Sequence, residues 1–125
     1  MRTREDVLDW LSSLLAFGVK PGLERMQAML LELQIDPDAI PTIHVAGTNG
    51  KGSTVAFLRE MGIAEGLQIG TFTSPYIIQF EERIMLNGVP IAEDELVAAA
   101  IAVQAAIGHI DPALGTVTEF EALTG

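Results

Sequence analysis

A glycine-rich segment with a single lysine carries the clearest chemical signal in this sequence. Residues 42–54 read TIHVAGTNGKGST, so an apolar run leads into glycines, one lysine and two hydroxyl residues. Glycines let successive backbone N–H groups converge on one anion. A helix that starts there adds unpaired N–H groups and the positive end of its dipole, and Lys51 adds a full charge for outer phosphates. The order of strand, glycine-rich turn and helix therefore predicts a phosphate-binding loop.

The segment departs from the general P-loop pattern G-x-x-x-x-G-K-[ST] at two positions. Val45 stands where the first glycine is expected, and Gly52 follows the lysine where Ser or Thr is usual. A dinucleotide-binding fingerprint fits the glycine spacing less well. The alternative interpretation is a glycine-rich turn with one solvated lysine. The flanking segments, which suit a strand and a helix, favour the phosphate-binding interpretation.

A second segment is predicted to reach the same place. Residues 67–72 (LQIGTF) form an expected strand, and a turn and a helix separate it from the strand expected at 43–46. Such a βαβ unit is parallel and right-handed, and its ligands bind beyond the carboxyl ends of the strands. Ser74, just past the second strand, would then lie beside the loop. Its oxygen makes it a candidate Mg²⁺ ligand, although a serine before proline is more often only a turn residue.

Local patterns predict the elements that position these segments. Helices are expected over residues 3–15 and 23–33, because their apolar residues recur at helical spacing. Two more helices are expected over residues 53–65, after the glycine-rich turn, and over 92–107, which is rich in alanine and starts with acidic residues. Thr3 is the expected cap of the first helix. Asn87 and Gly88 predict a type I′ hairpin within 83–91. His44, in the first expected strand, is interpreted as a packed core histidine.

Composition limits the class of protein. The chain has 125 residues, of which 49% are hydrophobic and 19% charged, and this composition argues against disorder. A net charge of −10 disfavours nucleic acid as a partner. The absence of cysteine excludes disulfides and thiolate metal sites. Because the sequence shows neither a secretory signal nor an apolar run long enough to span a bilayer, we expect no membrane association and a cytoplasmic location.

The expected fold class is α/β, with a P-loop-type parallel sheet flanked by helices and an added β-hairpin. Residues 1–125 are expected to form the N-terminal part of a larger ATP-binding domain. The visible parallel strands are too few for a covered sheet. In addition, the Thr118-x-x-Glu121 capping-box pattern begins a helix shortly before the last residue of the sequence.

The motifs together resemble a known family. HVAGTNGKGST, TFTSPY with FEERI close behind, NGVPI and VTEFEA are similar, in order and spacing, to the N-terminal portion of the folylpolyglutamate synthase / dihydrofolate synthase family of the Mur ligase superfamily. GTNGKGS alone would also fit the muramyl-peptide ligases, whereas TSP followed by ERI and TEFE favours the folate enzymes. The resemblance implies an ADP-forming ligase that uses ATP and Mg²⁺. Its carboxylate substrate, a folate or dihydropteroate, is converted to an acyl phosphate, which the amino group of L-glutamate attacks.

The resemblance also implies roles for individual residues, with Lys51 as the catalytic cation and Ser74 as a Mg²⁺ ligand. The residues expected to bind the ATP phosphates are Gly47, Thr48, Asn49, Gly50, Lys51, Gly52 and Ser53. The residues expected to contact the pterin-bearing substrate, with Phe120 as the stacking surface, are Gly18, Val19, Lys20, Pro21, Thr118, Glu119, Phe120 and Glu121.

Several expectations follow for the whole protein. The family's remaining Mg²⁺ ligands, adenine contacts and C-terminal domain would lie beyond residue 125. The isolated segment is therefore expected to be inactive, and the full-length parent to be monomeric. Two other functions stay open, namely a Mur-type peptide ligase and a stand-alone nucleotide-binding module without catalysis. The sequence also leaves open whether the parent makes dihydrofolate, extends polyglutamate tails or does both.

Overall fold

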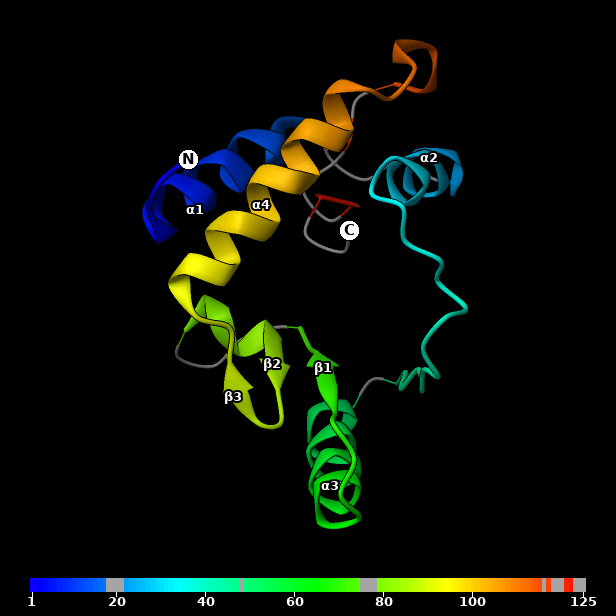
Figure 1. Ribbon diagram of the computed structural model, residues 1–125, viewed down its shortest axis with the longest axis vertical. Helices are drawn as coiled ribbons and strands as arrows, with labels where there is room; N and C mark the ends of the chain where they lie inside the picture. The colour runs from blue at the N-terminus through cyan, green and yellow to red at the C-terminus, as the bar shows by residue number, and fades with distance from the viewer. Residues whose placement is uncertain (18–21, 48, 75–78, 116, 118–120, 123–125) are drawn as a thin grey trace. The chain divides into compact units, whose positions relative to one another are not determined.

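The computed structural model describes residues 1–17, 22–47, 49–74, 79–115, 117 and 121–122 (Figure 1). The chain divides into two compact units. The first combines Met1–Pro41 with Glu93–Gly125, and the second is Thr42–Ala92. The fold is mixed α/β, as expected. Among the described helices, none is both long and apolar enough to cross a membrane.

The first unit is helical. It contains α1 (Arg4–Ser13), which continues into a 3-10 turn over Leu14–Phe17, together with α2 (Glu24–Glu32) and α4 (Glu93–Gly108). Helix α4 packs against both α1 and α2 (Figure 1). The buried apolar side chains of this unit are Val7, Leu11, Met29, Leu96, Val97, Ala100, Val103, Ala106, Ile110, Val117 and Ala122. The helices predicted over 3–15, 23–33 and 92–107 are confirmed, because each apolar face finds a partner within the unit.

The start of α1 is fixed by a reciprocal cap. The Thr3 hydroxyl accepts a hydrogen bond from the Asp6 amide at 3.2 Å, and the Asp6 carboxylate accepts one from the Thr3 amide at 3.1 Å. This confirms Thr3 as the cap and supplies acceptors for backbone donors that the helix itself leaves unpaired. The Arg4 amide also donates to the Glu93 carboxylate at 2.9 Å, which joins the starts of α1 and α4.

The cap makes a pH-dependent contribution to stability. Backbone donors from Arg2 and Thr3 hold the pKa of Asp6 below its ordinary value of 3.8. Since the pKa is lower in the folded state, the contribution is present above the ordinary value and is lost as the pH falls through the folded one. We therefore expect Asp6→Asn to lower the melting temperature at pH 7, by circular dichroism, and to have little effect near pH 2. Asp9→Asn, an exposed change on the same helix, is the control. An equal Asp6→Asn effect at both pH values would contradict this assignment.

The second unit contains one long helix and a small sheet. Helix α3 spans Lys51–Ala64, and the sheet has the order β1 (Gly70–Phe72), β2 (Ile84–Leu86) and β3 (Val89–Pro90), with both pairings antiparallel. Gly62 lets α3 approach the segment before β1, because a Cβ atom there would lie 2.7 Å from Ile69 Cδ1. The helix predicted over 53–65 is confirmed.

The hairpin between β2 and β3 forms as predicted. Asn87 and Gly88 have φ angles of +53° and +78°, as a type I′ turn requires. The Asn87 side chain accepts from the Ile69 amide at 2.8 Å, and the Asn87 amide donates to the Ile69 carbonyl at 2.7 Å. The turn residue thus also fixes the segment that leads into β1.

The expected parallel sheet is absent from the described part of the chain. Residues 41–47 form no strand, and β1 pairs antiparallel with β2 instead of parallel with 43–46. Ile43 is 74% exposed and His44 is also exposed, so the interpretation of His44 as a core residue is wrong. A parallel strand is normally covered on both faces. The described residues of this unit place no strand beside 43–46, and α3 itself has no buried residue.

Candidate functional site

The glycine-rich segment leads directly into α3. Gly50 caps the helix in the left-handed conformation, with φ +78°, which a residue with a side chain adopts less readily. The Thr54 amide donates to the Gly50 carbonyl at 2.9 Å, which closes the first helical turn. The amides of Lys51, Gly52 and Ser53 precede this bond and have no acceptor within the helix. Together with the helix dipole, they form a site suited to an anion.

The glycines keep the space around this helix start open. A Cβ atom on Gly50 or Gly52 would meet no atom within 4 Å. A Cβ atom on Gly47, where φ is +150°, would lie 3.8 Å from the Asn49 carbonyl oxygen and 4.0 Å from Lys51 Cγ. Gly47 therefore lies near the Lys51 side chain, and Gly50 and Gly52 leave the space beside the helix start open.

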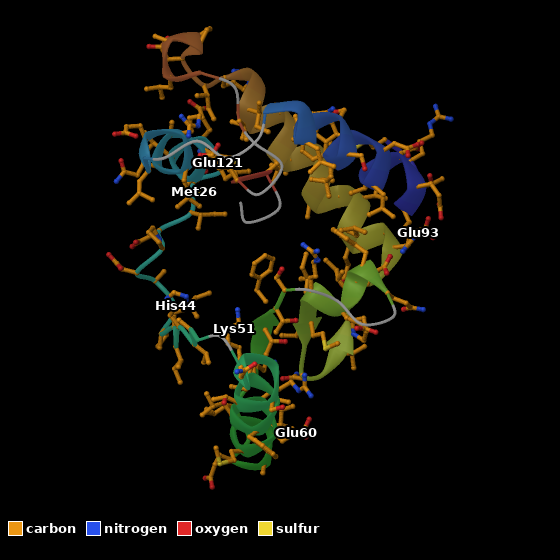
Figure 2. All side chains as sticks on the ribbon, turned by 180° about the vertical axis from the view of Figure 1, so that it is seen from behind. Met26, His44, Lys51, Glu60, Glu93 and Glu121 are labelled. Carbon is orange, nitrogen blue, oxygen red and sulfur yellow. The ribbon has the colours of Figure 1, made fainter. Side chains whose placement is uncertain are left out.

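Lys51 provides the positive charge at this position. It is exposed in the first turn of α3, and Figure 2 shows it at the opposite end of the helix from Glu60. The other cation between residues 42 and 74 is Arg59, whose guanidinium contacts the Glu60 carboxylate at 3.2 Å and Met85 Sδ at 3.6 Å. A cation beside the positive end of a helix dipole is unfavourable. An anion bound between the Lys51 ammonium group and the positive end of the α3 dipole would be attracted by both.

Ser74 lies in the same unit, just after β1. The Thr73 amide donates to the Arg83 carbonyl at 2.9 Å, and the Thr73 hydroxyl donates to the Glu82 carbonyl at 3.4 Å. These bonds continue the β1–β2 pairing by one residue, so the sheet positions the exposed Ser74. Within the described ranges, no group of three or more acidic or histidine side chains could hold a metal ion. The Ser74 hydroxyl is an oxygen donor of the kind that Mg²⁺ takes as a ligand.

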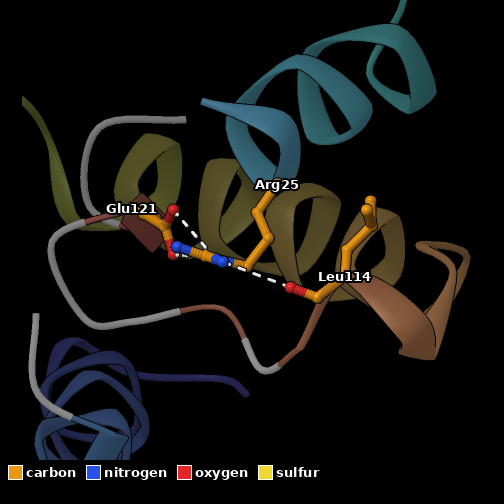
Figure 3. Close-up of polar contacts among 3 residues, drawn as sticks. All are labelled: Arg25, Leu114 and Glu121. Carbon is orange, nitrogen blue, oxygen red and sulfur yellow. Dashed lines mark hydrogen bonds and ion pairs between the residues drawn. The ribbon is translucent and has the colours of Figure 1, made fainter. Parts of the chain in front are cut away.

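A buried ion pair lies in the first unit and involves Glu121, one of the predicted substrate residues (Figure 3). Arg25 Nε donates to the two carboxylate oxygens of Glu121 at 2.9 and 3.1 Å, and Arg25 Nη1 donates to the Leu114 carbonyl at 3.2 Å. Arg25 and Glu121 are each only 7% exposed. The hydrogen-bonded carboxylate stabilises the cation and raises the pKa of Arg25.

Sequence reasoning missed the buried partner of Arg25, since Arg25 stands in the first turn of a predicted helix. One signal was present. Arg25 lies four residues before Met29, so both are on the same face of α2. Because that face is apolar and Met29 is fully buried, an arginine there requires a buried anionic partner.

The structure describes some of the predicted site residues and not others. The described loop residues, grouped at the start of α3, are Gly47, Asn49, Gly50, Lys51, Gly52 and Ser53. Ser74 belongs to the same unit, and Glu121 belongs to the other. The predicted site residues that lie outside the described residues are Gly18, Val19, Lys20, Pro21, Thr48, Thr118, Glu119 and Phe120.

Comparison with known proteins gives close relatives, although no family model matches the chain. The chain is 47% identical over 121 residues to dihydrofolate synthase/folylpolyglutamate synthase of Bacillus subtilis; this covers 96% of the chain and 28% of that protein. It is 44% identical over 84 residues to folylpolyglutamate synthase of Lacticaseibacillus casei, which covers 66% of the chain and 20% of the relative.

Solved structures of folylpolyglutamate synthases also match this chain. Folylpolyglutamate synthetase from Lactobacillus casei matches with a TM-score of 0.89 and 34% identity, over 98% of this chain and 31% of that one. An FPGS–AMPPCP–folate complex matches with a TM-score of 0.84 and 32% identity, over 96% of this chain and 30% of that one. The bifunctional folylpolyglutamate synthase/dihydrofolate synthase of Yersinia pestis, complexed with AMPPNP and Mn, matches with a TM-score of 0.83 and 31% identity. The match covers 96% of this chain and 28% of that one. The chain thus spans less than a third of the length of these relatives.

Proposed function

Because this chain belongs to the folylpolyglutamate synthase / dihydrofolate synthase family, we propose that it supplies the phosphate-binding part of an ATP-dependent ligase. The reaction adds L-glutamate to the carboxylate of a folate or dihydropteroate, with release of ADP and phosphate. The observation that carries this proposal is the start of α3, where amides without an acceptor inside the helix, open glycines and the Lys51 ammonium group occur together. The family relationship connects this anion site to a ligase.

The chemistry needs few reactive groups from the protein. The terminal phosphoryl group of ATP passes to the substrate carboxylate, which gives an acyl phosphate and ADP. The amino group of glutamate then attacks the acyl carbon, forms the amide and releases phosphate. Phosphoryl transfer depends mainly on positioning and charge neutralisation. In this proposal, the amides of residues 50–53 hold phosphate oxygens and Lys51 neutralises their charge, while Ser74 would hold the Mg²⁺ ion that accompanies ATP.

The proposed acid substrate rests on the family relationship. A solved relative is a complex with both AMPPCP and folate, which supports a folate-type substrate for this protein. The assignment of residues 18–21 and 118–121 to that substrate stays a prediction. A Mur-type ligase remains the second candidate from the sequence, but the reported relatives are folate enzymes.

Substrate dependence of ADP release tests the proposal. The natural gene product that contains this chain is incubated with ATP and Mg²⁺, and L-glutamate and dihydropteroate or tetrahydrofolate are added singly and together. We expect ADP release to require both glutamate and one of the folate-type acids. Release stimulated by a muramyl substrate would support the Mur-type alternative. ATP binding without acid-dependent release would support a nucleotide-binding module, and either result would reject the folate ligase.

The proposed Mg²⁺ role of Ser74 makes a separate prediction. Ser74→Ala removes one oxygen near the nucleotide, so we expect a higher Mg²⁺ concentration for half-maximal ADP release with an unchanged circular dichroism spectrum. Ser12→Ala, an exposed change in α1, is the matched control. A Mg²⁺ titration of Ser74→Ala that superimposes on the wild-type curve would reject the ligand role.

A further inference from the structure

Both asparagines of this chain are followed by glycine. Asn49 precedes Gly50 in the glycine-rich loop, and Asn87 precedes Gly88 in the hairpin. In such a pair, the backbone nitrogen of the glycine can attack the side-chain amide carbon of the asparagine, because glycine has no Cβ atom to hinder the approach. The reaction needs an asparagine side chain that can move and a glycine nitrogen that can lose its proton. The two pairs differ in both respects.

The side chain of Asn87 is held in place. Its Oδ1 atom accepts a hydrogen bond from the Ile69 amide at 2.8 Å, and the Asn87 amide donates to the Ile69 carbonyl at 2.7 Å. A Cβ atom on Gly88 would lie 3.5 Å from Arg59 Nε, so the Arg59 side chain packs beside this glycine. Attack on Asn87 therefore requires the side-chain hydrogen bond to break and the type I′ turn to distort.

The side chain of Asn49 is not held in this way. Asn49 and Gly50 are exposed, and within the described residues neither the Asn49 side chain nor the Gly50 amide makes a hydrogen bond. A Cβ atom on Gly50 would meet no atom within 4 Å. Gly50 caps α3, where the positive end of the helix dipole favours negative charge, and the cation Lys51 follows directly. Both favour the anion that forms when the Gly50 nitrogen loses its proton.

We propose that Asn49 is a site of spontaneous deamidation, which inactivates the phosphate-binding loop. The Gly50 nitrogen loses its proton and forms a bond to Asn49 Cγ. The bond from Cγ to the side-chain nitrogen breaks, and that nitrogen takes up the proton and leaves as ammonia. Water then opens the cyclic imide at either carbonyl, which gives aspartate or isoaspartate at position 49. Either product adds a negative charge beside the amides at the start of α3.

The effect of this modification on nucleotide binding rests on the proposed function. A new carboxylate in the loop repels the phosphates of ATP, so the modified protein should bind MgATP at least about tenfold more weakly. Bound phosphates, in turn, cancel the positive potential that favours the anionic Gly50 nitrogen. MgATP is therefore expected to slow the reaction at Asn49 and to leave the reaction at Asn87 unchanged.

Peptide mapping by mass spectrometry tests the modification. The natural gene product that contains this chain is incubated at mildly alkaline pH, and replacement of the side-chain NH2 group by OH is followed at positions 49 and 87. We expect conversion of Asn49 to be on the order of tenfold faster, because Asn87 must first break a hydrogen bond. In urea, which releases both side chains, the two rates should converge. A rate at Asn49 in the folded protein that does not exceed the rate at Asn87 would overturn the proposal, and a difference that persists in urea would overturn its structural explanation.

Charge-matched variants test the consequence for nucleotide binding. In isothermal titration calorimetry, Asn49→Asp should show the loss of MgATP affinity, whereas Asn87→Asp adds the same charge outside the loop and should bind MgATP as the wild type does. Preferential conversion of Asn49 together with unchanged MgATP affinity of Asn49→Asp would support the modification site and overturn its effect on the loop. A wild-type protein that does not bind MgATP would reject the proposed function, whereas the peptide mapping would still decide whether Asn49 is the modified residue.

Discussion

Replacing Lys51 with alanine is expected to weaken MgATP binding by roughly 2–5 kcal/mol, the usual cost of removing one partner from a hydrogen-bonded charge pair that is buried in the complex, as Lys51 would be beneath a bound phosphate. This corresponds to a loss of affinity between about thirtyfold and several thousandfold. Lys51 follows the left-handed Gly50 cap, next to amides that have no acceptor within α3. Isothermal titration calorimetry with MgATP measures the change. Lys51→Arg, which keeps the charge, should lose less affinity.

Lys51→Ala should not lower the thermal stability of the nucleotide-free protein. Lys51 stands at the positive end of the α3 dipole, where a cation is unfavourable. The melting temperature of Lys51→Ala without ATP should therefore equal or slightly exceed that of the wild type. Arg2→Ala causes the same change in net charge outside the loop and should leave MgATP affinity unchanged. Equal MgATP affinities for Lys51→Ala and the wild type would contradict the assignment of Lys51.

The second large effect is expected from Met29→Ala. Met29 has no exposed surface and lies on the side of α2 that contributes to the core with α4. Truncation of a buried methionine leaves a cavity, which typically lowers the free energy of unfolding by about 2–5 kcal/mol. Urea unfolding followed by circular dichroism measures this change as a lower midpoint.

Leu31→Ala is the matched control, because Leu31 is on the same helix and is 79% exposed. A change at such a position is usually within about 0.5 kcal/mol of the wild type. Equal midpoints for Met29→Ala and Leu31→Ala would show that α2 does not pack in solution as it does in this structure.

Structural features that depend on neighbouring residues could be predicted from the sequence, and the structure confirms them. The Thr3 cap, the type I′ turn at Asn87 and Gly88, and the helix that begins after the glycine-rich loop each depend on residues close together in the chain. Burial was predicted less well. His44 was interpreted as a core residue, yet it is exposed, because the described residues of its unit place no strand beside 43–46.

Features that depend on distant residues could not be predicted. The segment 43–46 has the apolar composition of a strand, but a strand forms only beside a partner, and the described residues of the second unit supply none for it. The pairing of Arg25 with Glu121 crosses 96 positions of sequence. Sequence patterns indicated a helix start at Arg25 and a cap or substrate contact at Glu121, whereas the structure joins the two side chains.

The central claim is that the backbone amides at the start of α3 bind the phosphates of ATP. The most direct test is an amide nitrogen–proton NMR titration of this chain with MgATP. We expect the largest chemical-shift changes at Gly50, Lys51, Gly52 and Ser53, and we expect them to disappear in Lys51→Ala at the same nucleotide concentration. Saturable shifts confined to residues outside 47–54 would contradict it.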